Sequence, residues 1–152
     1  YYTSDLVMVV KKGGKYENAT KLSDFKGATI TGQLNTFHYT VIDQIDGVKK
    51  DTAMDNFPAM RVALESGKID GYVSERPEGV SATSANKNFA MVEFADGQGF
   101  KTSDEDTAIA VGLKKDSDLK DKINKILAGI SEDERKDLMD QAIKDQPASE
   151  DN

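Results

Sequence analysis

Residues 57–74, FPAMRVALESGKIDGYVS, predict a helix and a strand that are joined by only a few residues. Pro58 suits the first turn of a helix, where its missing N–H is not needed, and Gly67 suits the position just past the last turn. The residues between them predict a helix over 57–66, and the apolar residues that follow predict a strand over 69–74. A helix that leads so closely into a strand is typical of an α/β fold.

Similar units lie on both sides of this one. Strands are predicted at residues 6–10, 28–31, 89–94 and 107–113, the first and the last as buried apolar runs. Helices are predicted from Phe37 to about residue 46, at 77–85, at 118–128 and from Ser131, where Glu134 completes a capping box. Because strands alternate with helices, we expect an open, mostly parallel sheet that is flanked by helices.

The composition excludes several classes of protein. The 152 residues include no Cys and one His, which rules out disulfides, thiolate zinc sites, a Cys nucleophile and any site with two His ligands in this chain. No apolar run approaches the ~18 residues of a membrane helix. The net charge is −7, and residues 131–152 hold eight acidic against three basic side chains. Neither part of the chain offers the basic surface of a nucleic-acid-binding protein.

Two candidate binding features follow neighbouring predicted strands. The turn at residues 32–37 lies between a strand and a helix, where backbone N–H groups and the Thr36 hydroxyl suit a carboxylate or phosphate. Glu75 follows the strand at 69–74 and suits an ammonium group. An α-amino acid carries both groups on one carbon. The residues alone also allow Thr36 as a simple N-cap, Glu75 in a local ion pair beside Arg76, and His38 either in the same pocket or on the surface.

Five stretches give the chain a resemblance to a known family. They are YYT at residues 1–3 leading into LVMVV at 6–10, LSDFKGATI at 22–30, QLNT at 33–36, ALESGKIDG at 63–71 with its spacing to Glu75, and the strand and helix at 108–127. In their order and spacing, the chain resembles the extracellular solute-binding proteins of ABC transporters for polar amino acids, the two-lobed family 3 type. The resemblance implies a periplasmic-binding-protein-like type II lobe.

The family's binding residues can be placed on this chain by position. In the family, the segment that matches residues 33–37 binds the ligand's carboxylate through backbone N–H groups, and the acid that matches Glu75 binds the α-ammonium. Thr36 matches the usual Thr, whereas Leu34 and Asn35 depart from a commoner Gly-Thr pattern. Glu75 stands where Asp is common. The ligand-binding residues that the resemblance implies are Gln33, Asn35, Thr36, Phe37 and Glu75.

The resemblance also implies a domain plan and partners. Residues 1–104 would form the second ligand-binding lobe with its hinge strands, and 105–146 a return strand and helices that pack on the first lobe. Residues 147–152 are expected to form a disordered tail, and the chain is expected to be a piece of a longer protein. The expected partners are an amino acid and the membrane permease, at the extracellular or periplasmic face, with the intact protein anchored to the membrane. In this piece, self-association through the exposed C-terminal helices is expected.

No catalytic residue, metal site or cofactor is expected under this interpretation. One alternative is an enzyme on the same scaffold, such as a cyclohexadienyl dehydratase-like protein, for which His38 and Glu75 are the available acid–base groups. A second alternative is the sensory domain of a receptor.

Overall fold

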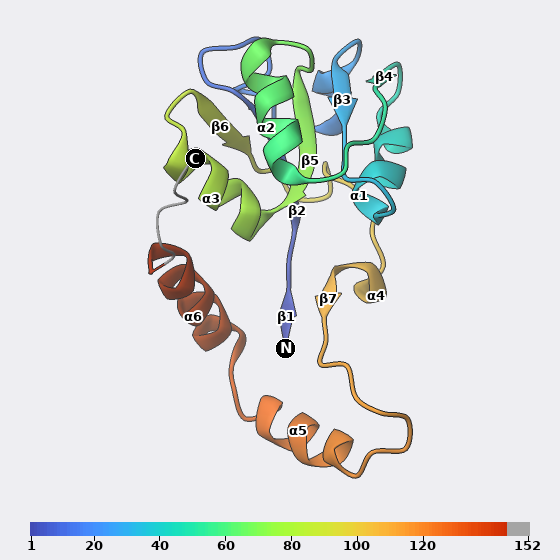
Figure 1. The fold of residues 1–152 in the computed structure, drawn as a ribbon, viewed down its shortest axis with the longest axis vertical. Coiled ribbons are helices and arrows are strands. Elements are labelled where there is room, and N and C mark those ends of the chain that lie inside the picture. The colour runs from blue at the N-terminus through green and yellow to red at the C-terminus, as the bar shows by residue number, and fades with distance from the viewer. Residues whose placement is uncertain (146–152) are drawn as a thin grey trace.

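The computed structural model describes residues 1–145 and forms one five-stranded sheet, a short two-stranded ribbon and two trailing helices (Figure 1). The sheet has the strand order β4-β3-β5-β2-β6, and the ribbon pairs β1 with β7. The strands are β1 (Tyr2–Thr3), β2 (Leu6–Lys11), β3 (Thr29–Thr31), β4 (Lys49–Lys50), β5 (Gly71–Glu75), β6 (Phe89–Val92) and β7 (Ala108–Ile109). The helices are α1 (Phe37–Thr40), α2 (Phe57–Ser66), α3 (Arg76–Ala85), α4 (Asp104–Thr107), α5 (Leu119–Leu127) and α6 (Glu132–Lys144), with 3-10 turns η1 (Leu22–Phe25) and η2 (Val41–Gln44).

Four of the five strands of the sheet run in the same direction. β3 is parallel to both β4 and β5, while β2 is antiparallel to its two neighbours, β5 and β6. The predicted open, mostly parallel sheet is therefore confirmed, with β2 as the one reversed strand. Parallel neighbours matter for function, because their carboxyl ends meet at one edge of the sheet.

Both faces of the sheet are covered, which explains why β2 is apolar without alternation. On one face, α2 and α3 pack on Val9 and Tyr72. On the other face, η1, η2 and the segment at 93–102 cover Met8 and Ile30. That second cover is rich in aromatic rings, with Phe94 lying 5.4 Å from the Phe100 ring and 6.1 Å from the Phe25 ring between centroids.

The helix–strand unit at residues 57–74 folds as its sequence predicts. The side chain of Asn56 caps α2 by accepting a hydrogen bond from the backbone N–H of Ala59 at 3.0 Å. Pro58 lies in the first turn, and Gly67 ends the helix in the left-handed conformation with φ 78°. The helix bounds match the prediction, and β5 begins and ends within two residues of it.

The predicted buried strand at 107–113 is wrong in its extent. Only Ala108 and Ile109 form a strand, against the two residues of β1, and Thr107 ends α4. Val111 and Leu113 are 48% and 38% exposed. An apolar run indicates that burial is favourable, but it does not supply a covering layer. In the described part of the chain nothing covers these side chains enough to bury them.

The C-terminal helices begin as predicted but carry exposed apolar side chains. Ser131 accepts a hydrogen bond from the N–H of Glu134, whose carboxylate accepts from the Ser131 N–H, so the capping box is confirmed. Leu119, Ile126 and Leu138 are 47%, 68% and 63% exposed. No helix within residues 1–145 is long and apolar enough to cross a membrane. The tail expected at 147–152 lies outside the described residues.

The close approach of α1 to the end of β3 requires a glycine at position 32. A Cβ atom there would lie 2.9 Å from the backbone N and Cα atoms of Tyr39. We predict that Gly32→Ala lowers the free energy of unfolding by about 1–3 kcal/mol, because backbone cannot move aside as a flexible side chain can. Urea unfolding followed by circular dichroism measures this, with Gly112→Ala as the matched control, since nothing lies within 4 Å of a Cβ there. Equal stabilities for the two variants would contradict the prediction.

Candidate functional site

The sheet brings the two predicted binding features to one edge. β3 and β5 are parallel neighbours, with Thr31 opposite Tyr72 in the register. The loop at 32–36 leaves the end of β3, and Glu75 is the last residue of β5. Residues separated by about forty positions in sequence therefore meet at the carboxyl ends of adjacent parallel strands, where open α/β sheets bind ligands.

The loop after β3 is fixed by hydrogen bonds to the chain that follows β4. The N–H of Leu34 donates to the carbonyl of Met54 at 2.8 Å, and Gln33 donates through Nε2 to the carbonyl of Asp55 at 3.2 Å. Asn35 has φ 61°, the left-handed region that suits Gly and that Asn adopts more readily than most residues. This position can therefore keep a glycine-like backbone although the sequence departs from Gly there.

Thr36 occupies the N-cap position of α1 but does not cap it with its side chain. Its backbone is extended, and its hydroxyl donates to the carbonyl of Gln33 at 2.8 Å, so the predicted N-cap is correct in position and wrong in its hydrogen bond. Within residues 1–145, no group accepts a hydrogen bond from the backbone N–H of Asn35, Thr36 or Phe37. In this part of the chain, three consecutive donors are thus unpaired directly before His38, the residue that contacts Glu75.

The other side of the site is a histidine–glutamate pair. Nε2 of His38 lies 3.4 Å from Oε1 of Glu75, and the two side chains are 9% and 24% exposed. The ring of Phe37 covers the imidazole, with 4.5 Å between centroids. Neither imidazole nitrogen has a hydrogen-bond partner among the described residues. The interpretation of His38 as a surface residue is therefore wrong: it is buried beside Glu75.

The local ion pair considered for Glu75 does not form. Arg76 instead places its Nε 2.8 Å from Glu93 and its Nη1 3.5 Å from Asp140. Both partners help to raise the pKa of the Arg76 guanidinium, and the hydrogen bond that Arg76 donates to Glu93 contributes most. Because its sequence neighbour is occupied elsewhere, the Glu75 carboxylate faces His38 rather than a permanent cation.

A partly buried polar network next to Glu75 in the sequence was not found from the sequence. Glu78 accepts hydrogen bonds from Nη2 of Arg61 at 2.7 Å and from the hydroxyl of Ser74 at 2.7 Å, and the Tyr72 hydroxyl lies 3.4 Å away. Burial, followed by the charge of Glu78, raises the pKa of Tyr72. The network ties α2, the end of β5 and the first turn of α3 together. Its members lie up to 17 positions apart and form no sequence motif, so no local pattern predicts the network.

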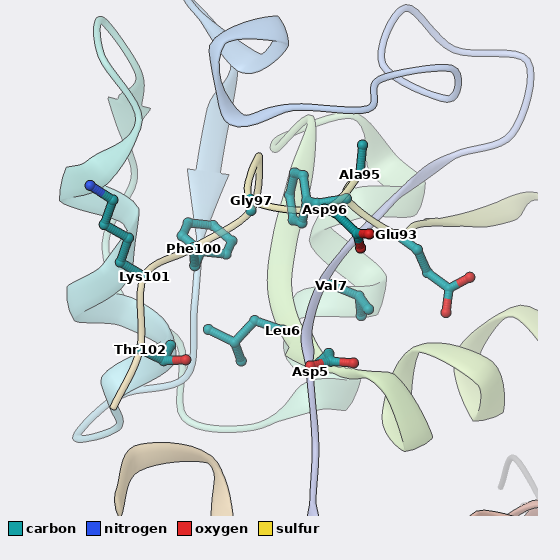
Figure 2. Close-up of a pocket in the computed structure, with 12 residues that line it drawn as sticks. Asp5, Leu6, Val7, Glu93, Ala95, Asp96, Gly97, Phe100, Lys101 and Thr102 are labelled. Atoms are coloured by element: carbon teal, nitrogen blue, oxygen red, sulfur yellow. The ribbon is translucent and has the colours of Figure 1, made fainter. Parts of the chain in front are cut away.

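The site residues do not line either of the hollows described in this chain. A cavity of about 410 Å³ lies beneath the segment at 93–102, between Asp5, Leu6 and Phe100 (Figure 2). A hollow of about 510 Å³ lies against α5. The edge formed by residues 33–37 and Glu75 is open to solvent, with Leu34 and Asn35 exposed and the Glu75 side chain 24% exposed. No group of three or more Asp, Glu or His side chains in the described range is arranged to hold a metal ion.

Comparison with solved structures places this fold among amino-acid-binding proteins. An amino acid ABC transporter substrate-binding protein from Streptococcus pneumoniae, bound to L-arginine, is 24% identical with a TM-score of 0.74, covering 95% of this chain and 58% of that one. An ancestral arginine-binding protein bound to glutamine is 25% identical with a TM-score of 0.62, and the match covers 95% of this chain and 59% of that one. Domain 2 of the Thermotoga maritima arginine-binding protein is 22% identical with a TM-score of 0.52, covering 57% of this chain and 92% of that domain.

These similarities show that the chain has the predicted periplasmic-binding-protein-like fold. The chain spans about three fifths of the length of the first two proteins. No protein-family model and no curated protein sequence matches it.

The Glu78 network gives a prediction about stability. We expect Glu78→Gln to lower the free energy of unfolding by about 1–3 kcal/mol, because the Arg61 guanidinium, 27% exposed, then loses its carboxylate. Urea unfolding measures the change. Glu65→Gln is the matched control, because Glu65 is an exposed acid on α2. Its carboxylate accepts a hydrogen bond from the neutral amide of Asn86 at 3.3 Å, so the substitution leaves no cation without its partner. A Glu78→Gln variant as stable as the control would show that the network contributes little.

Proposed function

We propose that this chain is the second lobe and C-terminal part of the substrate-binding component of an amino acid ABC importer. One observation carries the proposal. The Glu75 carboxylate, at the end of β5, lies at the same sheet edge as three unpaired backbone N–H groups at residues 35–37. The fold shared with proteins bound to L-arginine and to glutamine supports it.

The chemistry of this edge matches the head group of an α-amino acid. The unpaired N–H groups of Asn35, Thr36 and Phe37 donate to the ligand's carboxylate. The Glu75 carboxylate accepts from its ammonium in a charge-assisted hydrogen bond, which is shorter and stronger than a neutral one. Glu75 is 24% exposed and forms no ion pair with a Lys or Arg within residues 1–145, so it is accessible to a cationic ligand group. The ligand's side chain would extend away from this edge.

The open edge fits a clamp in which a further lobe supplies the opposite wall. The ligand would bridge the two lobes and shift the population toward the closed form, which then docks on the membrane permease. The antiparallel ribbon of β1 and β7 would serve as the connection between lobes, since the chain passes through it twice. In the same proposal, the exposed apolar residues of α5 and α6 pack on the further lobe. The protein would act at the extracellular or periplasmic face, anchored to the membrane.

An enzyme on this scaffold is the second candidate. The 3.4 Å separation of His38 and Glu75 resembles an acid–base pair, which is the specific observation in its favour. The solved structures that share the fold are named as binding proteins, which favours the binding function. Turnover of a prephenate-like substrate that Glu75→Gln abolishes would support the enzyme instead.

Calorimetric titration with the common amino acids tests the proposal, using the natural chain that contains these residues. We expect one or a few amino acids to bind, with L-arginine and L-glutamine tested first. Glu75→Gln should raise the Kd about 10- to 100-fold, because a hydrogen bond to a charged group contributes about 1.5–3 kcal/mol. Glu105→Gln, an exposed acid on α4, is the matched control and should bind like the wild type. Absence of binding by every amino acid, or unchanged binding by Glu75→Gln, would contradict the proposal.

A further inference from the structure

The buried imidazole of His38 has no assigned role in the binding chemistry described so far. Its side chain is 9% exposed, and both ring nitrogens lack a hydrogen-bond partner in the described part of the chain. Buried polar groups are nearly always paired, so two unpaired nitrogens on one ring need an explanation. Among the described residues, the Glu75 carboxylate is the charged group in ion-pair contact with the ring, at 3.4 Å from Nε2.

The surroundings of α1 leave Glu75 as the natural partner of a charged imidazole. On η2, Asp43 is held by Lys50 from β4 at 2.9 Å, and that Lys50 also lies 4.2 Å from the centre of the Tyr39 ring. At the start of α3, Arg76 is paired with Glu93. On β1, the Tyr2 phenol has a pKa that burial raises further, so it stays neutral near pH 7. Within residues 1–145, the acidic side chain in ion-pair contact with His38 is Glu75.

We propose that His38 and Glu75 form one proton-linked unit that makes ligand binding weaken as the pH falls. This inference rests on the proposed function, in which Glu75 binds the ligand's ammonium. A neutral His38 leaves the carboxylate free for that ammonium. A protonated His38, buried and 3.4 Å away, takes the carboxylate itself, because a buried cation is stable only when it is paired.

The direction of the pH dependence follows from linkage. Of the side chains in this pair, an imidazole is the kind that proteins use to change charge near neutral pH. An α-amino acid keeps both head-group charges between pH 5.5 and 7.5. Since the ligand binds the form with neutral His38, binding must release protons where the imidazole is partly protonated. His38 is thus a positioning residue that acts through Glu75.

The test is the Kd of the natural chain for the amino acid that it binds most tightly, measured at pH 5.5 and 7.5. We expect Kd to be several-fold higher at pH 5.5, because a protonated His38 competes with the ligand's ammonium for the Glu75 carboxylate. His38→Gln keeps an N–H donor near Glu75 but cannot take up a proton. Its Kd should be the same at both pH values within about twofold.

A second measurement keeps the proposal testable if His38→Gln does not fold. Calorimetry of the wild type at pH 6.5, in two buffers of different ionisation enthalpy, counts the protons exchanged on binding. We expect a net release of protons when the ligand binds. A wild-type Kd independent of pH, no proton release, or a His38→Gln variant with the full pH dependence would each overturn the linkage while leaving the proposed function intact. If no amino acid binds at either pH, the proposed function fails and this inference fails with it.

Discussion

The parallel pairing of β3 with β5 is the constraint on which the candidate site depends. It sets Thr31 opposite Tyr72, so the loop that follows β3 and the last residue of β5 end at the same edge of the sheet. A shift of one residue would turn each strand's side chains to the other face. The apolar residues on both faces of β5, Tyr72 toward the helices and Val73 toward the opposite layer, oppose that shift because both are fully buried.

Packing around the two strands then sets the geometry of the edge. Gly32 lets the backbone of α1 approach the end of β3, which carries His38 to Glu75. Close to Glu75 in the sequence, the Glu78 carboxylate holds the Ser74 hydroxyl and the Arg61 guanidinium, fixing the passage from β5 into α3. Arg76 is drawn to Glu93 on the other side. Each of these contacts leaves the Glu75 carboxylate facing the same open edge as the loop at 33–37.

Local sequence patterns predicted the bounds of helices and strands well, but they predicted poorly which segments are buried under a second layer. The cap, proline and glycine of α2 lie within a dozen residues, so the bounds of that helix could be predicted. The meeting of residues 33–37 with Glu75 could also be predicted, because both follow strands of one parallel sheet. The prediction of a long buried strand at 107–113 was wrong, because burial depends on a second layer of structure and the sequence of one segment does not show whether that layer is present. The Glu78 network was missed, and the burial of His38 was left open. Both depend on contacts between segments that are distant in the sequence.

Residues 33–37 and Glu75 are proposed to bind the head group of an α-amino acid together. Nuclear magnetic resonance of the 15N-labelled chain, residues 1–152, titrated with L-arginine and then with L-glutamine, examines this residue by residue, because shift changes locate even weak binding. We expect changes concentrated at the amides of Asn35, Thr36, Phe37, His38 and Glu75, with those of α5 unaffected. Changes centred on the cavity beside Leu6 and Phe100, or no change with any common amino acid, would contradict it.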